Sequence, residues 1–239
     1  KDFLIEKYNL QNKKIILFIG QHDGWSGLLP RNTEVSKSLS PWFPTTKDAL
    51  NFLLSSVEKI DQGIVLFKPH PHDPEDYDSI QHHSLQLVKD ENLYSLFELS
   101  NVVVAMSTTA QFEGLWYDKP LLLLGKSQLS GKCIAYEYSG EDSLVDLLNN
   151  SLILNDFENK KKNARYFLYG LMSDFLYGVN DTVPTQRRIG DLAKDIAKVI
   201  TVPPQKTSFA TMKMKLKPFD IDVIINEERN SLSHEVRLI

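Results

Sequence analysis

The chain has 239 residues, 42% of them hydrophobic and 24% charged, which is the composition of a globular protein with a substantial core. Its net charge of -4 argues against nonspecific binding to nucleic acid or to anionic lipid. A single cysteine, Cys133, excludes an intrachain disulfide and a four-cysteine zinc site. Because no apolar run is long enough to cross a bilayer, we expect a cytoplasmic protein with at most peripheral contact at the inner face of the membrane.

Strand-type and helix-type patterns alternate along the chain. Apolar, β-branched runs predict buried parallel strands at residues 14–19, 63–67, 101–106 and 120–125. Helical spacing predicts a helix that contains Glu113 and further helices at residues 2–8, 46–59, 93–99, 142–149, 156–172 and 186–200. Helices between parallel strands give a doubly wound, Rossmann-like α/β sheet. We expect this nucleotide-sugar-binding domain to span residues 1–202, and residues 203–239 to form a linker and a returning or partner-contacting tail.

Two polar segments directly follow predicted strands. In Lys-Pro-His-Pro-His-Asp at residues 68–73, the two prolines stiffen the backbone around His70. In Ser-Thr-Thr at residues 107–109, one hydroxyl is expected to cap the next helix, where free amide hydrogens favour an anion. Ligands of open α/β sheets bind where the carboxyl ends of strands converge, so together the two segments predict a phosphate site. Taken singly, each has an ordinary alternative, a surface turn or a simple helix cap.

The order of these motifs resembles the carboxyl-terminal, donor-binding half of a GT-B glycosyltransferase. It is most similar to the capsule-polysaccharide synthesis family and to related bacterial transferases that use CMP-activated Kdo. The resemblance covers residues 14–140 and depends on four motifs: Phe-Ile-Gly-Gln at 18–21, Lys-Pro-His-Pro at 68–71, Ser-Thr-Thr with Glu113 at 107–113, and Lys-Pro with Leu-Gly at 119–125.

The resemblance implies a nucleotide-sugar site and its chemistry. The implied donor-binding residues are Gln21, Lys68, His70, Ser107, Thr108, Thr109 and Glu113. His70 and the hydroxyls would hold the CMP phosphate, Lys68 would add charge, and Glu113 would bind the ribose or the base. The departing CMP gains negative charge that such donors stabilise, so no metal or other cofactor is expected beside the donor CMP-Kdo.

Asp23 is the second implied catalytic residue besides His70. Family members of this kind retain the anomeric configuration, which a carboxylate nucleophile at Asp23 would explain. Asp23 could instead act as a base in the reaction. The sequence departs from the capsule pattern after Gln21, where His22-Asp23-Gly24 stands in place of a longer spacing. The ordinary alternative is an aspartate that caps a nearby loop.

Several neighbouring residues have two interpretations. His72 and Asp73 either orient His70 or belong to a turn, and Trp25 is either a core residue or a platform for a sugar. We expect His82-His83 to be a surface pair without a partner at metal-binding spacing, and Asp76-Tyr77-Asp78 to lie in a solvated loop rather than to bind a metal.

The sequence therefore predicts a CMP-Kdo-dependent, retaining glycosyltransferase that acts on a polysaccharide or glycolipid acceptor. The acceptor-binding domain is expected outside this chain, and no nucleic acid partner is expected. The alternatives are an enzyme similar to UDP-N-acetylglucosamine 2-epimerases or to CDP-glycerol glycerophosphotransferases and, in another class, a noncatalytic nucleotide-binding or scaffold domain.

Overall fold

The computed structural model describes residues 2–171, 177–178 and 187–188, and the chain divides into two compact units at residues 161 and 162. The strands of the first unit are β1 (Lys14–Ile19), β2 (Gly63–Lys68), β3 (Leu85–Leu87), β4 (Val102–Ala105), β5 (Leu121–Leu123) and β6 (Tyr136–Glu137). Its helices are α1 (Asp2–Lys7), α2 (Asp23–Ser26), α3 (Glu34–Leu39), α4 (Thr46–Val57), α5 (Leu93–Leu99), α6 (Ala110–Trp116) and α7 (Leu144–Leu152). Helix α8 (Phe157–Gly170) spans the boundary between the units.

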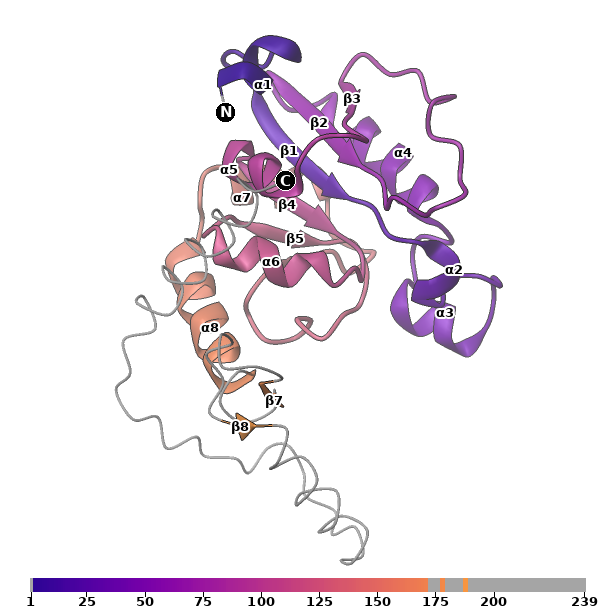
Figure 1. Cartoon of the computed structure of the whole chain (residues 1–239), viewed down its shortest axis with the longest axis vertical. Helices are drawn as coiled ribbons and strands as arrows, with labels where there is room; N and C mark the ends of the chain where they lie inside the picture. The colour runs from indigo at the N-terminus through magenta and orange to yellow at the C-terminus, as the bar shows by residue number, and fades with distance from the viewer. Residues whose placement is uncertain (1, 172–176, 179–186, 189–239) are drawn as a thin grey trace, which may run out of the picture. The chain divides into compact units, whose positions relative to one another are not determined.

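The six strands form one parallel sheet in the order β3-β2-β1-β4-β5-β6 (Figure 1). The chain winds outward in both directions from β1 and β4, so the strand order reverses between these two strands. The predicted doubly wound, Rossmann-like fold is confirmed by this topology. The carboxyl ends of β1 and β4 open the crevice in which such sheets bind ligands.

Alternate residues of each strand face opposite layers of helices. Residues such as Phe18, Phe67 and Val104 pack with the apolar sides of α4 and α7 in one buried core. On the other face, α5 and α6 contact β1, β4 and β5. Because both faces are covered, the central strands are continuously apolar between their ends, with Lys14 starting β1 and Lys68 ending β2, as expected for a parallel sheet.

The register fixes where the ends of the strands lie. Ile19 pairs with Lys68 on one side and with Ala105 on the other. Gly20 N then donates to Lys68 O at 2.8 Å, and a Cβ on Gly20 would lie only 3.0 Å from Pro69 Cα. A residue without a side chain is therefore needed where β1 passes the start of the proline segment.

The structure adds elements that the pattern did not predict. Helices α2 and α3 form between β1 and α4, β3 lies in a segment that the pattern left unassigned, and β6 follows β5. The helix predicted at 186–200 lies outside the described residues except for Arg187 and Arg188, which instead form β8 as the parallel partner of β7 (Tyr177–Gly178). The predicted boundary after residue 202 also lies outside them. None of the helices in the described part is long and apolar enough to cross a membrane.

Candidate functional site

Gln21 connects the two strand ends at the switch point. Its Oε1 accepts hydrogen bonds from the backbone N–H and from the hydroxyl of Ser107, both at 3.0 Å. Its Nε2 donates to Ser26 Oγ in α2 at 3.1 Å. Gln21 is only 3% exposed, so the amide acts as a buried tie between β1, β4 and α2. The structure thus brings two predicted donor-site residues, Gln21 and Ser107, into direct contact.

The hydroxyl cluster ends in two unoccupied donors. Thr109 stands at the cap position of α6, but its side chain makes no capping hydrogen bond, contrary to the cap expected there. Within the described residues, the Thr108 and Thr109 side chains have no hydrogen-bond partner. Thr108 is half-buried and Thr109 is exposed, so their O–H groups are accessible to a ligand.

His70 is oriented by its own turn. The backbone N–H of His72 donates to His70 Nδ1 at 3.2 Å, so in the neutral ring the proton sits on Nε2, which is left as a donor. Burial lowers the pKa of His70 below 6.5, and the neighbouring His22 and His72 lower it further, whereas Asp73 opposes the shift. At neutral pH His70 therefore presents an uncharged N–H donor.

His22 and Trp25 join His70 in one cluster that sequence reasoning did not identify. The His22 ring stacks on Trp25 with centroids 4.2 Å apart, and His70 meets both edge-on at 6.0 Å and 5.6 Å. Trp25 N donates to His22 Nδ1 at 3.1 Å, which leaves His22 Nε2 as a second donor. Trp25 is 71% exposed, so it lies on the surface rather than in the core, and its role as a platform for a sugar stays a prediction. The only sequence signal was the position of His22 and Trp25 after the first strand.

Lys68 and Glu113 lie apart from this cluster. The Lys68 ammonium donates to the carbonyl of Lys89, and burial lowers its pKa. Glu113, in the first turn of α6, accepts a hydrogen bond from Tyr94, and burial raises the pKa of its carboxyl. Neither side chain contacts His70 in the described part of the chain.

Asp23 is turned into the protein. Its carboxylate is 5% exposed and accepts from the backbone N–H of Thr46 at 2.9 Å and from the Thr46 hydroxyl at 2.5 Å. Thr46 is the first residue of α4, so Asp23 binds the positive end of that helix. Burial raises the pKa of Asp23, and the two bonds from Thr46 oppose the shift. Asp23 therefore caps a helix that starts 23 residues later, rather than the nearby loop of the ordinary alternative. The nucleophile stays a prediction that requires the carboxylate to turn outward.

The segment after His70 is a turn stabilised by Asp73. Asp73 Oδ2 accepts from the Tyr77 hydroxyl at 2.7 Å, and the Tyr77 ring packs against Phe67 at 4.8 Å. His72 orients His70 through its backbone, whereas the Asp73 side chain does not contact the His70 ring. Asp78 pairs with Lys89, as expected for a solvated loop.

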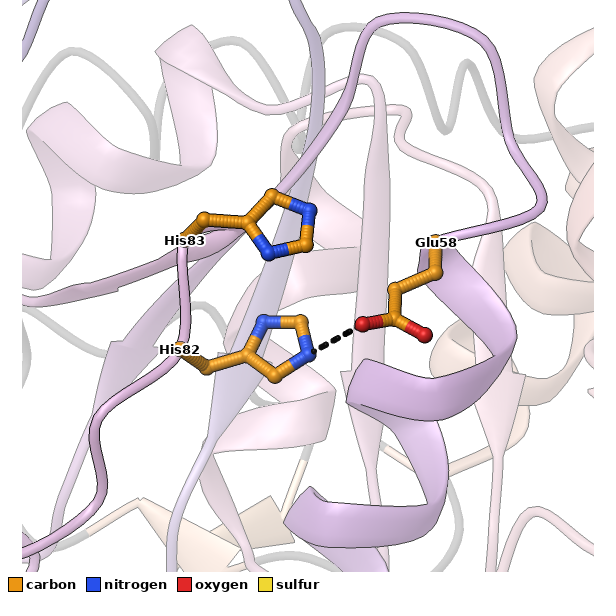
Figure 2. Close-up of side chains that lie close together, drawn as sticks. All are labelled: Glu58, His82 and His83. Carbon is orange, nitrogen blue, oxygen red and sulfur yellow. Dashed lines mark hydrogen bonds and ion pairs between the residues drawn. The ribbon is translucent and has the colours of Figure 1, made fainter.

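The expectation that His82-His83 lacks a partner is wrong. His82 Nε2 lies 3.0 Å from Glu58 Oε1, and His83 stacks on His82, so three potential metal ligands gather there (Figure 2). Glu58 and His82 are 24 residues apart in the sequence, and β3, which follows the histidines, pairs with β2, which follows Glu58. A hollow of about 440 Å³ adjoins this group, at the end of the sheet where the strands begin.

Comparison with known proteins gives solved structures only. No protein-family model and no curated protein matches the chain. The β-Kdo 2,7-transferase KpsC of Thermosulfurimonas dismutans is 20% identical over 64% of this chain and 53% of that one, with a TM-score of 0.41. The glycosyltransferase SnogD from Streptomyces nogalater (12% identity, 78% and 44% coverage, TM-score 0.41) and the wall teichoic acid polymerase TagF (14%, 84% and 46%, 0.45) also match. The chain spans about half the length of these structures. At such scores, the function has to follow from the chain's own residues.

Proposed function

We propose that this chain is the donor-binding part of a glycosyltransferase that moves Kdo, or a related 2-keto sugar acid, from a CMP-activated donor to a polysaccharide or glycolipid acceptor. The reaction retains the anomeric configuration, needs no metal, and takes place at the cytoplasmic face of the membrane. The observation that supports the proposal is the placement of these donors in the sheet: His70 follows β2, and Thr108 and Thr109 follow β4, so all three come after the carboxyl ends of the two strands that flank β1.

The spacing of the strands suits one phosphate group. Lys68 and Ala105 lie in register with the same residue of β1, so their backbones are two strand spacings, or about 10 Å, apart. His70 and Ser107 each stand two residues further along. A phosphate between these segments would receive His70 Nε2–H from one side and the threonine hydroxyls from the other.

The charges near the site also suit an anion. The carboxylate of Asp23 is directed to Thr46 and that of Asp73 to Tyr77, so neither is directed at His70. When the glycosidic bond breaks, CMP gains a negative charge, and donors held in place before the reaction stabilise that charge as it develops. This electrostatic role needs the N–H of neutral His70, and a protonated ring would serve it still better.

The choice of CMP and Kdo comes from the motif resemblance, so nucleotide binding is the first test. Isothermal titration calorimetry of the 239-residue chain should give tighter binding of CMP than of UDP. His70→Ala should lower the affinity for CMP about tenfold or more, because one hydrogen bond to a charged group is lost. The matched control is His72→Ala, which keeps the backbone N–H that orients His70 and should bind normally.

Other outcomes would redirect the proposal. Preference for UDP would remove the CMP donor, and turnover of UDP-N-acetylglucosamine without an acceptor would favour the epimerase. Unchanged CMP affinity in folded His70→Ala would remove the site itself.

A further inference from the structure

A group of side chains that could bind a metal lies at the end of the sheet where the strands begin, opposite the end that carries the proposed donor site. Glu58 is the residue at the carboxyl end of α4, and His82 and His83 precede β3 (Figure 2). One carboxylate oxygen and one nitrogen from each imidazole all lie within 4.8 Å of one another. The two rings stack with centroids 4.8 Å apart, and both lie beside the Glu58 carboxylate.

We propose that Glu58, His82 and His83 bind a zinc ion. Zinc takes imidazole and carboxylate ligands in a tetrahedral arrangement, and sites with three protein ligands complete it with water. With bonds of about 2.0–2.1 Å, the ligand atoms of a tetrahedral zinc ion are about 3.4 Å apart. Side-chain rotations that move these atoms by about an ångström would bring them from within 4.8 Å of one another to that distance. Two imidazoles favour zinc over magnesium or calcium, which prefer oxygen ligands.

The surroundings favour a cation here. The carboxyl end of α4 carries a partial negative charge at Glu58. Glu58 and His83 line the hollow of about 440 Å³, which has room for a water ligand and gives the ion a route from solvent. Asp61 lines the same hollow, as does Lys13, whose ammonium donates to Gln62 Oε1 at 2.9 Å.

The two histidines differ in readiness to bind. His83 makes no hydrogen bond in the described part of the chain, so its nitrogens are free to coordinate. His82 Nδ1 accepts from Ser84 N at 3.2 Å, so the ring proton lies on Nε2 and points to Glu58. Zinc at Nε2 moves that proton to Nδ1 and breaks the bond from Ser84. Loss of one such bond lowers the affinity about three- to tenfold, and the Ser84 amide becomes a reporter of binding.

A bound ion would join α4 to the segment that leads into β3. β3 has three residues, all only half-buried, and it pairs with β2 alone, so a bound ion would add a second attachment beside this pairing. Because the unfolded chain has no such site, zinc at about a hundred times its Kd should raise the folded-to-unfolded ratio about a hundredfold.

The test is zinc titration of the 239-residue chain, freed of any histidine tag, by calorimetry, with cobalt absorption as a second measure. We expect one ion per chain, a zinc-dependent rise in Tm, no such rise with magnesium, and a shift of the Ser84 amide signal in NMR spectra. His83→Gln and Glu58→Gln should each weaken binding about tenfold or more. Both side chains are exposed, and circular dichroism would verify that the variants fold.

Two matched controls separate coordination from general effects. Asp61→Asn removes a negative charge from the hollow, as Glu58→Gln does. His72→Gln makes the same substitution as His83→Gln, but beside His70, at the end of the sheet where the strands end. Both controls should bind zinc as the unaltered chain does. Absence of saturable zinc binding, unchanged affinity in His83→Gln and Glu58→Gln, or an equal loss in either control would overturn the proposal.

Discussion

Replacement of Asp23 distinguishes a helix-capping aspartate from a nucleophile. Asp23→Ala leaves the N–H and hydroxyl of Thr46 without an acceptor at a fully buried position. An unsatisfied buried donor costs about 1–3 kcal/mol, and the lost charge at the start of α4 adds up to about 1 kcal/mol. We therefore expect a loss of about 2–4 kcal/mol in the free energy of unfolding, or roughly 4–16 °C in Tm.

Asp23→Asn should behave differently. Its Oδ1 can accept from Thr46 N while Nδ2 donates to the Thr46 hydroxyl, so the stability should stay within about 1 kcal/mol of wild type at pH 7. Burial raises the pKa of Asp23 above 3.8, so the folded chain binds this proton more tightly than the unfolded chain. That contribution is complete at low pH and is lost as the pH rises through the folded pKa. The asparagine variant has no such loss, so its stability relative to wild type should increase from acid to neutral pH.

Urea unfolding followed by tryptophan fluorescence measures both effects, since Trp25, Trp42 and Trp116 all lie in the first unit. Equal destabilisation by alanine and asparagine, or none by alanine, would refute the capping geometry. In an assay of the proposed transferase activity, retained turnover in Asp23→Asn would exclude the nucleophile, whereas its abolition in a stable variant would require the carboxylate to turn toward the substrate.

Three further predictions concern the proposed site. Burial lowers the pKa of His70, so CMP affinity measured by calorimetry should rise, relative to that of His70→Ala, as the pH falls through this lowered pKa and the ring gains its charge; the same slope in both proteins would exclude His70 as the cause. Gly20→Ala places a Cβ 3.0 Å from Pro69 Cα, so we expect a loss of about 1–3 kcal/mol in urea unfolding together with weakened CMP binding, and a neutral result would show that the two strand ends can separate. Glu113→Gln keeps an acceptor for Tyr94, so its stability in urea should change by less than about 0.5 kcal/mol while CMP affinity falls about tenfold; equal affinity would remove Glu113 from the donor site.

The central strands were predictable because burial on both faces requires continuous apolar runs, such as those that became β1, β2 and β4. Strand β6 has two residues and α2 four, too few for a periodic pattern. Helix α2 depends instead on His22 Nδ1, which accepts from Trp25 N. Such a cap was not recognised because histidine is uncommon in that position.

The site was predictable only where local sequence restricts the backbone. Prolines on both sides of His70 marked it as a fixed residue at a strand end, and the structure places it there. The direction in which Asp23 points depends on Thr46, which is 23 residues away, so no local sequence pattern could predict that direction. Likewise, the partner of His82 comes from α4 and could not be read from the His-His pair.

The same local arrangement of histidines occurs at both ends of the sheet, for which we propose opposite ligands. His22, His70 and His82 each accept a backbone N–H at Nδ1, from a residue two or three positions later, so each ring presents a Nε2–H. Where the strands end, the nearby carboxylates are bound to Thr46 and Tyr77, and the exposed groups are donors that suit an anion. Where the strands begin, Glu58 faces His82, and a cation can replace the proton between them. We therefore expect the position of the carboxylates, rather than that of the histidines, to determine which end of the sheet binds phosphate and which end binds a metal ion.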